Sequence, residues 1–182
     1  EFNDEEIAVI KSLQFLTLKP VLTVINTGED LQEEMERYDE LKNTLQERGN
    51  TVLFLSAAIE QEIQQLDEEE RNAFMADLGL SEPASHRLSR AAYSCLGLIS
   101  FFTCGPGEVR AWTISNGCTA PEAAGKIHSD LQRGFIRAET ISFEELMEAG
   151  SEKAAKEAKL YKLNGKDYII KDGDVVDIRF NV

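Results

Sequence analysis

Two short apolar runs separated by one polar segment constrain this fold more than any other feature of the sequence. The runs are VLTVI at residues 21–25 and TVLFL at 51–55, and each is a continuous stretch of β-branched and apolar residues, as in strands buried in a parallel sheet. The Glu-rich segment between them, about 30–48, is predicted to be a helix that ends at Gly49. Strand, crossover helix and strand together predict a right-handed βαβ unit.

Two strands are too few for a complete doubly wound domain, so the first part of the chain is expected to be the tail end of one. Residues 4–18 are predicted to be a helix capped by Asp4, and residues 57 to about 97 are predicted to be helical, with a break at Glu82-Pro83. The stripe expected on the first helix consists of Ile7, Ile10, Leu13 and Leu18. The exposed edge of so small a sheet also predicts either self-association into a homo-oligomer or a rearranged first half of the chain.

Beyond Leu98 the hydrophobic pattern changes from helical to strand-like. The strand candidates are ISFFT, EVRAWTI, FIRAETI, YII and VVDIRFNV, and they are separated by turns and by the helix APEAAGKIHSDLQRG. The dipeptides NG at 116–117 and 164–165 and DG at 172–173 are turn signals. This pattern predicts a compact α+β domain, so the domains expected are residues 1–97 and 98–182.

The net charge of −14 lies almost entirely in the first part of the chain. Residues 1–97 carry 8 Lys and Arg against 20 Asp and Glu, a net charge of −12, whereas residues 98–182 carry 11 against 13, a net charge of −2. An acidic surface disfavours phosphate contact, so DNA binding is not expected and any RNA contact is expected in the second part.

Two further features of the composition bear on location. No apolar run approaches the roughly 20 residues that cross a bilayer, so no membrane contact is expected. The odd number of cysteines, Cys95, Cys104 and Cys118, predicts free thiols in a reducing compartment, hence the cytoplasm.

The stretch NTGE, residues 26–29, follows the first predicted strand, where ligands bind in parallel α/β sheets. An Asn amide both donates and accepts, so Asn26 could brace a loop or contact a base edge. GTP-binding domains select guanine here with N-K-x-D, whose Asp accepts from two guanine N–H groups. Thr27 and Glu29 replace that Lys and Asp, which favours adenine over guanine. The alternative is a strand that simply runs into a turn.

Ser56, Ala57 and Ala58 follow the second predicted strand, where a companion base-binding loop would lie. Small side chains let the backbone approach a flat ring, and Ser56 is also a candidate helix cap; both roles are compatible. The phosphate-binding pattern G-x-x-x-x-G-K-[ST] does not occur in this sequence, and CGPGE at 104–108 is predicted to be a turn between strands. The sequence therefore predicts the base end of a nucleotide site without its phosphate end.

In the second part, Arg110 and Trp112 share one face of a predicted strand. A Trp beside an Arg could stack on RNA, whereas the alternative is a Trp that fills the core of a small domain. Lys126, Arg133 and Arg137 add positive charge but are interleaved with acidic residues. No metal-ligand cluster and no catalytic constellation is apparent, so no metal or catalytic residue is predicted.

Taken in order, these segments resemble the YchF subfamily of Obg-like P-loop ATPases. The stretches EVRAWTISNGCTAPEAAGKIHSDLQRGFIRAETISFEEL and GKDYIIKDGDVVDIRFNV are similar to the family's C-terminal TGS domain, a β-grasp module. QFLTLKPVLTVINTGED and SAAIEQEIQQLDEEERNAFMADLGL are similar to its base-recognition loop and the segment that follows. The resemblance extends from about residue 4 to the C-terminus.

The resemblance implies an incomplete C-terminal part of a P-loop NTPase Rossmann-like sheet over 1–97, followed by a TGS domain over 98–182. Residues 4–18 would be the helix that returns from the family's coiled-coil insertion. The family's N-x-x-E motif falls on Asn26 and Glu29, with the Thr27 backbone placed to meet adenine, which implies ATP in preference to GTP. Mg²⁺ and hydrolysis are expected only in the complete protein, because the P-loop would precede this stretch.

Family members bind ribosomes, so the resemblance also implies docking on the ribosome or its RNA through the second domain. The residues expected to contact it are Arg110, Trp112, Lys126, Arg133 and Arg137. One alternative is a non-enzymatic module that binds RNA or protein without nucleotide. Another is a regulatory domain that senses a small ligand, as TGS-like domains occur in threonyl-tRNA synthetases and stringent-response enzymes.

Overall fold

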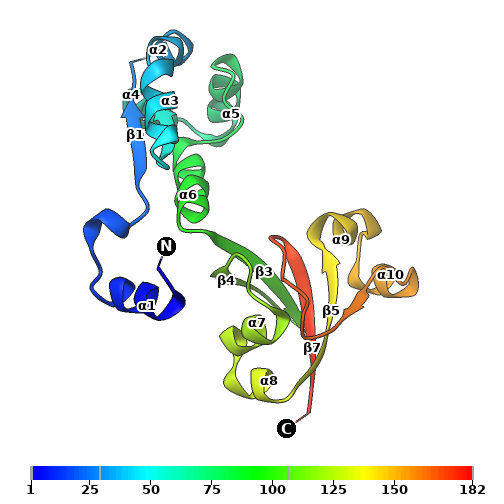
Figure 1. The fold of residues 1–182 in the computed structure, drawn as a ribbon. Helices are drawn as coiled ribbons and strands as arrows, with labels where there is room; N and C mark the ends of the chain where they lie inside the picture. The colour runs from blue at the N-terminus through cyan, green and yellow to red at the C-terminus, as the bar shows by residue number, and fades with distance from the viewer. Residues whose placement is uncertain (1, 29, 106, 182) are drawn as a thin grey trace. The chain divides into compact units, whose positions relative to one another are not determined.

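A computed structural model of the chain describes residues 2–28, 30–105 and 107–181. The chain divides into two compact units, Glu1–Leu96 and Gly97–Val182, each built around its own sheet (Figure 1). Within the described ranges, none of the helices combines the length and the apolar character that crossing a membrane requires.

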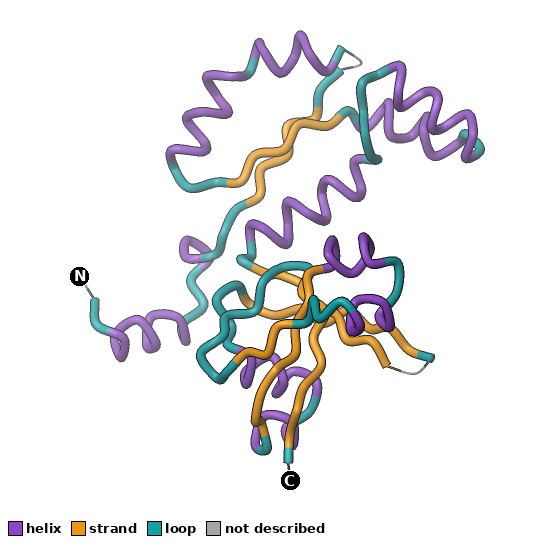
Figure 2. The backbone as a smooth tube through the Cα atoms, turned by 90° about the vertical axis from the view of Figure 1, so that its right-hand side faces the viewer, coloured by secondary structure: helices purple, strands orange, loops and turns teal. Residues whose placement is uncertain are grey.

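The first unit contains a pair of strands and a series of short helices. Its elements are α1 (Asp4–Ser12), a 3-10 turn (Leu16–Leu18), β1 (Leu22–Asn26), α2 (Leu31–Arg37), α3 (Asp39–Glu47), β2 (Thr51–Leu55), α4 (Ala57–Gln65), α5 (Glu68–Asp77) and α6 (Ala84–Cys95). β1 and β2 pair in parallel, from Leu22 opposite Thr51 to Asn26 opposite Leu55, and lie side by side in Figure 2. The predicted βαβ unit is therefore confirmed, and Gly49 follows its helix with the left-handed φ of 81°.

The long helices predicted for this unit are divided. The segment expected as one helix over 4–18 ends at Leu13, because Gln14 has a φ of 50° and the chain re-forms only a 3-10 turn afterwards. Its cap is Asn3, not Asp4, since the Asn3 side chain accepts from the Glu6 N–H and the Glu6 carboxylate accepts from the Asn3 N–H. The helix expected over 30–48 bends at Tyr38.

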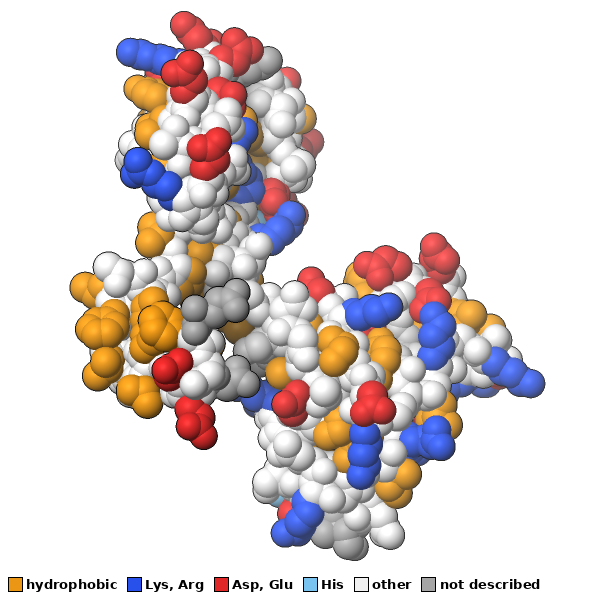
Figure 3. Space-filling model, viewed as in Figure 1, with side chains coloured by type: hydrophobic (Ala, Val, Ile, Leu, Met, Phe, Trp, Pro, Cys, Tyr) orange, Lys and Arg blue, Asp and Glu red, His pale blue; other side chains and the backbone are white. Residues whose placement is uncertain are grey.

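The expected apolar stripe on α1 is not buried within the described residues. Leu13 and Leu18 are 59% and 54% exposed, and apolar side chains gather on the surface around α1 (Figure 3). The core of the unit lies elsewhere, where Ile59 and Ile63 of α4 pack against Met75 of α5. α4 and α5 separate at Leu66, whose backbone is extended, and Asp67 caps the second of them by accepting from the Glu70 N–H.

The second unit is a five-stranded mixed sheet with helices on both faces. Its elements are β3 (Leu98–Gly105), β4 (Glu108–Ser115), α7 (Ala120–Ile127), α8 (Ser129–Arg133), β5 (Phe135–Ser142), α9 (Phe143–Ala149), α10 (Glu152–Glu157), β6 (Lys162–Asn164) and β7 (Asp174–Phe180). The strand order is β4-β3-β7-β5-β6. The expected strand YII is wrong: residues 162–164 form β6 instead, and Ile169 makes only an isolated bridge to Thr119.

Successive residues of the central strands face opposite sides of this sheet, which gives the unit two apolar clusters. Phe101, Val176 and the three fully buried alanines of α7 form one cluster, on which Trp112 also packs. Phe102 and Val175 belong to the other face, where α9 and α10 contribute the packing. Because Ala120, Ala123 and Ala124 have no bulk beyond Cβ, α7 can lie close to the strands.

The three cysteines are free thiols, as predicted, and each of them is half-buried. Burial raises the pKa of the Cys104 thiol, and the nearby Glu152 carboxylate adds to this effect. A thiol with a raised pKa carries less thiolate at neutral pH, so Cys104 is expected to react slowly.

Two capping boxes in the second unit make a pH-dependent contribution to stability. The Glu122 carboxylate accepts from the Thr119 N–H at 2.7 Å, and the Glu145 carboxylate accepts from the Ser142 N–H at 3.2 Å. These backbone hydrogen bonds lower the pKa of both carboxyls, with Lys162 also contributing at Glu145. The stabilisation is therefore present above the ordinary glutamate pKa of about 4.3 and is lost as the pH falls through the lowered values.

We expect the melting temperature of the native chain to fall on acidification from pH 5 to 3 (roughly the window set by these carboxyls). A variant with Glu122→Gln and Glu145→Gln should melt at a lower temperature near neutral pH and lose less on acidification, because glutamine does not titrate. Thermal unfolding followed by circular dichroism at each pH measures both curves. Parallel curves for the two proteins would contradict this assignment.

Candidate functional site

The carboxyl ends of β1 and β2 place two predicted loops next to each other. Asn26 ends β1 directly opposite Leu55, which ends β2, so Thr27 and Ser56 begin the two loops at the same edge of the sheet. Thr27 and Ser56 are 7% and 4% exposed, whereas Asn26 is exposed. At this edge of the sheet the polar residues Thr27 and Ser56 are therefore buried, and the Asn26 amide is exposed.

Direct hydrogen bonds join the loops. The Ala57 N–H donates to Asn26 Oδ1 at 3.0 Å, across 31 residues of sequence. The Thr27 N–H and hydroxyl both donate to the Leu55 carbonyl, at 2.9 Å and 3.2 Å. Asn26 therefore braces the start of α4, one of the two roles that the sequence left open, while its Nδ2 group has no partner among the described residues.

α4 begins within this brace. Ser56 is its N-cap, and the Ser56 hydroxyl accepts from the Ile59 N–H at 3.4 Å, as predicted. The Ala57 N–H donates to Asn26 and the Ile59 N–H donates to Ser56. The Ala58 N–H between them has no hydrogen-bond partner among the described residues. Ala57 and Ala58 are exposed and small, so a flat ligand can approach the backbone here.

Below the loops, α6 supports β2. The Arg87 guanidinium donates to the Phe54 carbonyl at 2.6 Å, and the Ala84 N–H at the start of α6 donates to the Glu60 carboxylate on α4. This role of Arg87 could not be predicted from the sequence, because its partner is a backbone carbonyl 33 residues away and no local pattern marks such a contact. Glu29, the predicted acidic member of the loop, lies outside the described residues.

In the second unit, Arg110 and Trp112 form a stacked pair on β4. The guanidinium carbon of Arg110 lies 4.2 Å from the Trp112 ring centroid, and Trp112 Nε1–H donates to the Thr103 hydroxyl at 3.0 Å. Trp112 is half-buried against the cluster around Phe101. Trp112 therefore packs in the core, which is the alternative considered from the sequence, and one edge of its ring remains at the surface. The hydrogen bond from Trp112 to Thr103 was not predicted.

The remaining predicted cations do not all share the face of this pair. Lys126 and Arg133 belong to α7 and α8, which pack on the Trp112 face, and Arg133 donates to Asp130 at 2.8 Å. Arg137 is exposed, and the next residue, Ala138, is buried in the cluster on the Trp112 face of the sheet. Because successive residues of a strand face opposite sides, the Arg137 side chain lies on the other face. The His128 side chain is 64% exposed, and its Nδ1 accepts from the Asp130 N–H.

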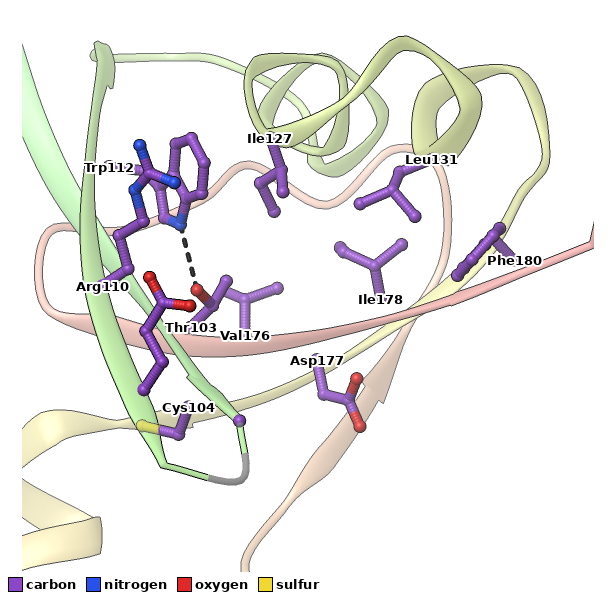
Figure 4. A pocket seen from close by; sticks show the side chains of 12 residues that line it. Thr103, Cys104, Arg110, Trp112, Ile127, Leu131, Val176, Asp177, Ile178 and Phe180 are labelled. Atoms are coloured by element: carbon purple, nitrogen blue, oxygen red, sulfur yellow. Dashed lines mark hydrogen bonds between the residues drawn. The ribbon is translucent and has the colours of Figure 1, made fainter.

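No group of His, Cys, Asp or Glu residues that could hold a metal ion occurs in the part of the chain that the structure describes. The second unit contains a cavity of about 450 Å³ that has both polar and apolar walls (Figure 4). Arg110 and Trp112, two of the residues predicted to contact RNA, line this cavity, but the sequence did not predict a cavity beside them.

The chain resembles known proteins over its whole length. The family model YchF-GTPase C, described as "Protein of unknown function (DUF933)", matches residues 98–181. The chain is 49% identical over 182 residues to a ribosome-binding ATPase YchF of Escherichia coli O157:H7, covering 100% of this chain and 50% of that protein. The corresponding protein of Bacillus subtilis is 44% identical over 185 residues, with the same coverage.

More distant relatives match equally far along the chain. Human Obg-like ATPase 1 is 38% identical over 193 residues, covering 100% of this chain and 46% of that protein. The solved structure of the Schizosaccharomyces pombe YchF GTPase superposes with a TM-score of 0.78 at 31% identity, covering 98% of this chain and 48% of that one. The chain thus spans about half the length of the curated relatives that it matches.

Proposed function

The chain belongs, by homology over its whole length, to the YchF and Obg-like ATPases, and we propose that it carries the base-recognition end of an ATP site and a ribosome-docking domain. The relatives that support this proposal are named ribosome-binding ATPases. In this proposal residues 1–97 are the C-terminal part of a Rossmann-like nucleotide-binding domain, and residues 98–182 are a TGS domain of the β-grasp type. The protein acts in the cytoplasm.

One observation carries the nucleotide half of the proposal: Asn26 bridges the two loops at the sheet edge where ligands bind in parallel α/β proteins. Its Oδ1 is engaged by the Ala57 N–H, so the group left to meet a ligand is the Nδ2 donor. The Ala58 N–H adds a second donor on the neighbouring loop. Both purines carry acceptors that these donors can meet, so the two donors support binding of a purine, and the choice between adenine and guanine depends on the acidic position of the loop.

Guanine fits the same arrangement less well. Its selection requires a carboxylate that accepts from two N–H groups, and the residue at that place is Glu29, one methylene longer than the Asp of N-K-x-D. Thr27 replaces the stacking Lys and is turned inward, where its hydroxyl donates to Leu55. We therefore assign Asn26, Thr27, Glu29 and the segment Ser56 to Ala58 to the adenine end of the site. Hydrolysis and Mg²⁺ binding belong to the complete protein.

Substitution of Asn26 separates the brace from the base contact. Asn26→Asp keeps an oxygen that accepts from Ala57 but removes the Nδ2 donor, whereas Asn26→Ala removes both. In the complete protein we expect calorimetry to show ATP bound at least about tenfold more tightly than GTP, and Asn26→Asp to weaken ATP binding by about tenfold without lowering the melting temperature. Asn26→Ala should weaken binding and also lower the melting temperature.

The control is Asn43→Asp on α3, which introduces the same change of charge away from the loops. A preference for GTP in the native protein would overturn the base assignment. An Asn26→Asp protein that binds ATP like the native one would leave Asn26 as a structural brace alone.

For ribosome docking, the α7–α8 side of the second unit is the favoured surface. Lys126 and Arg133 are exposed on these two helices, and Arg110 is exposed on the same face of the sheet through its stack with Trp112. Arg137 lies on the other face and serves as a matched control. Phosphate contacts by Lys and Arg release counterions, so their loss weakens binding and also reduces its salt dependence.

We expect the double variant Lys126→Ala with Arg133→Ala to pellet less with ribosomes than the native chain, and to reduce the slope of log K against log salt by about 1–2. Arg137→Ala should change neither quantity. Sedimentation at a series of salt concentrations measures both. Equal losses in the two proteins would show that the contact is not confined to the α7–α8 side.

The exposed edge of the two-stranded sheet supports a further part of the proposal, self-association of the chain. β1 pairs with β2 on one side only in the described structure, and Val24 at its centre is 40% exposed. A sheet edge of this kind offers unpaired backbone groups to a second copy.

A further inference from the structure

The sheet of the second unit opens between its two central strands. β3 and β7 run parallel, but within the described residues they pair only at Phe102 and Val175. Both strands continue beyond that point, β3 to Gly105 with β4 on its outer side and β7 to Phe180 with β5 on its outer side. In Figure 4 the side chains of Arg110 and Trp112 lie on one side of the cavity, and those of Ile178 and Phe180 of β7 lie on the other.

A cavity of about 450 Å³ occupies this opening. Thr103 and Trp112 of the hairpin form one wall, and Ile127 and Leu131 of the helices form another. Ile178 and Phe180 of β7 line the remaining side, with Phe180 48% exposed at the outer end. The cavity is therefore apolar along β7 and large enough to take a Leu or an aromatic side chain with adjacent main chain.

Backbone groups also face the opening. Along a strand, alternate residues direct their N–H and C=O groups to opposite neighbours. β7 keeps β5 as a partner from Asp174 to Phe180 but has β3 only at its start, so the backbone groups of 176–180 that face β3 have no strand partner in the described chain. Unpaired strand edges of this kind accept a further strand.

The charges around the opening favour a peptide over RNA. Two carboxylates, Glu108 and Asp177, line the cavity together with a single cation, Arg110. The Arg110 guanidinium already lies over the Trp112 ring, so the ring face that a base would stack on is occupied. The Asp177 carboxylate is paired with Arg179 at 3.7 Å, so the lining is close to neutral, which suits a peptide's neutral main chain better than a phosphate backbone.

We propose that this opening binds an extended peptide segment of another protein, which adds as a strand along residues 176–180 of β7 and inserts one Leu or aromatic side chain between Ile178 and Leu131. Main-chain hydrogen bonds to the unpaired edge supply affinity, and the cavity selects the inserted side chain. This site is independent of the nucleotide site proposed above, because its residues all belong to the second unit.

The proposal can be tested by selecting random phage-displayed decapeptides in parallel on the 182-residue chain and on the Phe180→Ala chain. Peptides that are enriched on the native chain alone are then synthesised, and their binding is measured. Phe180 lines the cavity and is half exposed, so its loss should weaken binding of such a peptide by about fivefold to tenfold without unfolding the unit. The control is Leu163→Ala, which removes a similarly exposed apolar residue from β6, at the other edge of the sheet. It should bind like the native chain.

Two further measurements distinguish strand addition from simple side-chain docking. Hydrogen exchange of those amides of 176–180 that face away from β5 should slow by about tenfold or more when the peptide is bound, because these amides gain partners. Two peptides should be compared, one N-methylated at the odd-numbered residues and the other at the even-numbered residues. The one whose methyl groups replace the N–H groups that face β7 should fail to bind. Failure to enrich peptides that depend on Phe180, protection confined to other strands, or displacement of the peptide by oligo(U) RNA would each overturn the proposal.

Discussion

Replacing Phe101 by Ala is expected to lower the free energy of unfolding of the second unit by about 3–5 kcal/mol, the range for deletion of a fully buried aromatic side chain. Phe101 is 0% exposed and lies opposite Trp112 in the β3–β4 ladder. Its ring fills the space between the sheet and the alanines of α7, which are too small to expand into the cavity left behind. The cost should therefore lie in the upper part of the range.

Trp112 is the only tryptophan of the sequence and packs on the same cluster, so its fluorescence reports on this unit. Urea denaturation followed by that fluorescence measures the change in free energy. Phe180→Ala is the matched control, because this phenylalanine is 48% exposed and its loss should cost less than about 1 kcal/mol. A Phe101→Ala protein within 1 kcal/mol (roughly the control value) of the native chain would contradict the described core.

The parts of the fold that could be predicted are those marked by local chemistry. The two apolar runs and Gly49 were sufficient for the parallel pair β1–β2, since a continuous apolar run bounded by a turn residue has few other structures open to it. The interruptions of the predicted helices at positions without Gly or Pro were not predicted. At Asp67 the signal was present, because Asp67 with Glu70 three residues later is a capping pattern, but the prediction of a helical segment over 57–97 did not use it.

In residues 160–174, by contrast, local composition predicts the wrong secondary structure. YII has the composition of a strand, but Ile170 is buried by packing on the Phe101 cluster and its N–H donates to the Cys118 carbonyl, so the segment is ordered by distant partners. The short strand β6 pairs with β5 through Asn164 and Lys162, residues with no strand preference. In both cases tertiary contacts override local propensity.

The candidate nucleotide site was predictable in position but not in its contacts. Its position follows from the rule that ligands lie beyond the carboxyl ends of parallel strands, which Asn26 and Ser56 obey. The hydrogen bond from the Ala57 N–H to Asn26 joins residues 31 apart, and no spacing in the sequence identifies it. The cavity beside Trp112 was missed for the same reason, since it arises from the divergence of β3 and β7.

Loss of the Asp174 side chain is the second change for which a large effect is expected. Asp174 is 4% exposed, and its Oδ2 accepts from the Tyr168 hydroxyl at 2.8 Å and from the Lys171 N–H at 3.0 Å. Asp174→Ala leaves both donors without this acceptor, so we expect the unit to lose about 2–4 kcal/mol of unfolding free energy. Asp174→Asn keeps one acceptor oxygen and should lose about half as much. Asp167→Ala, an exposed aspartate in the same loop, is the control and should cost almost nothing.

The same contact predicts an alkaline effect, which separates loss of the hydrogen bond from general loosening of the core. Burial raises the pKa of Tyr168, and the hydrogen bond to Asp174 raises it further. Its contribution to stability is therefore complete below the ordinary tyrosine pKa of about 10 and is lost as the pH rises through the raised value. In Asp174→Asn the pKa of Tyr168 should be lower than in the native chain, because the acceptor no longer carries a charge. An ultraviolet titration of the phenolates measures this pKa; an unchanged value would mean that the Tyr168 hydroxyl is not held by Asp174.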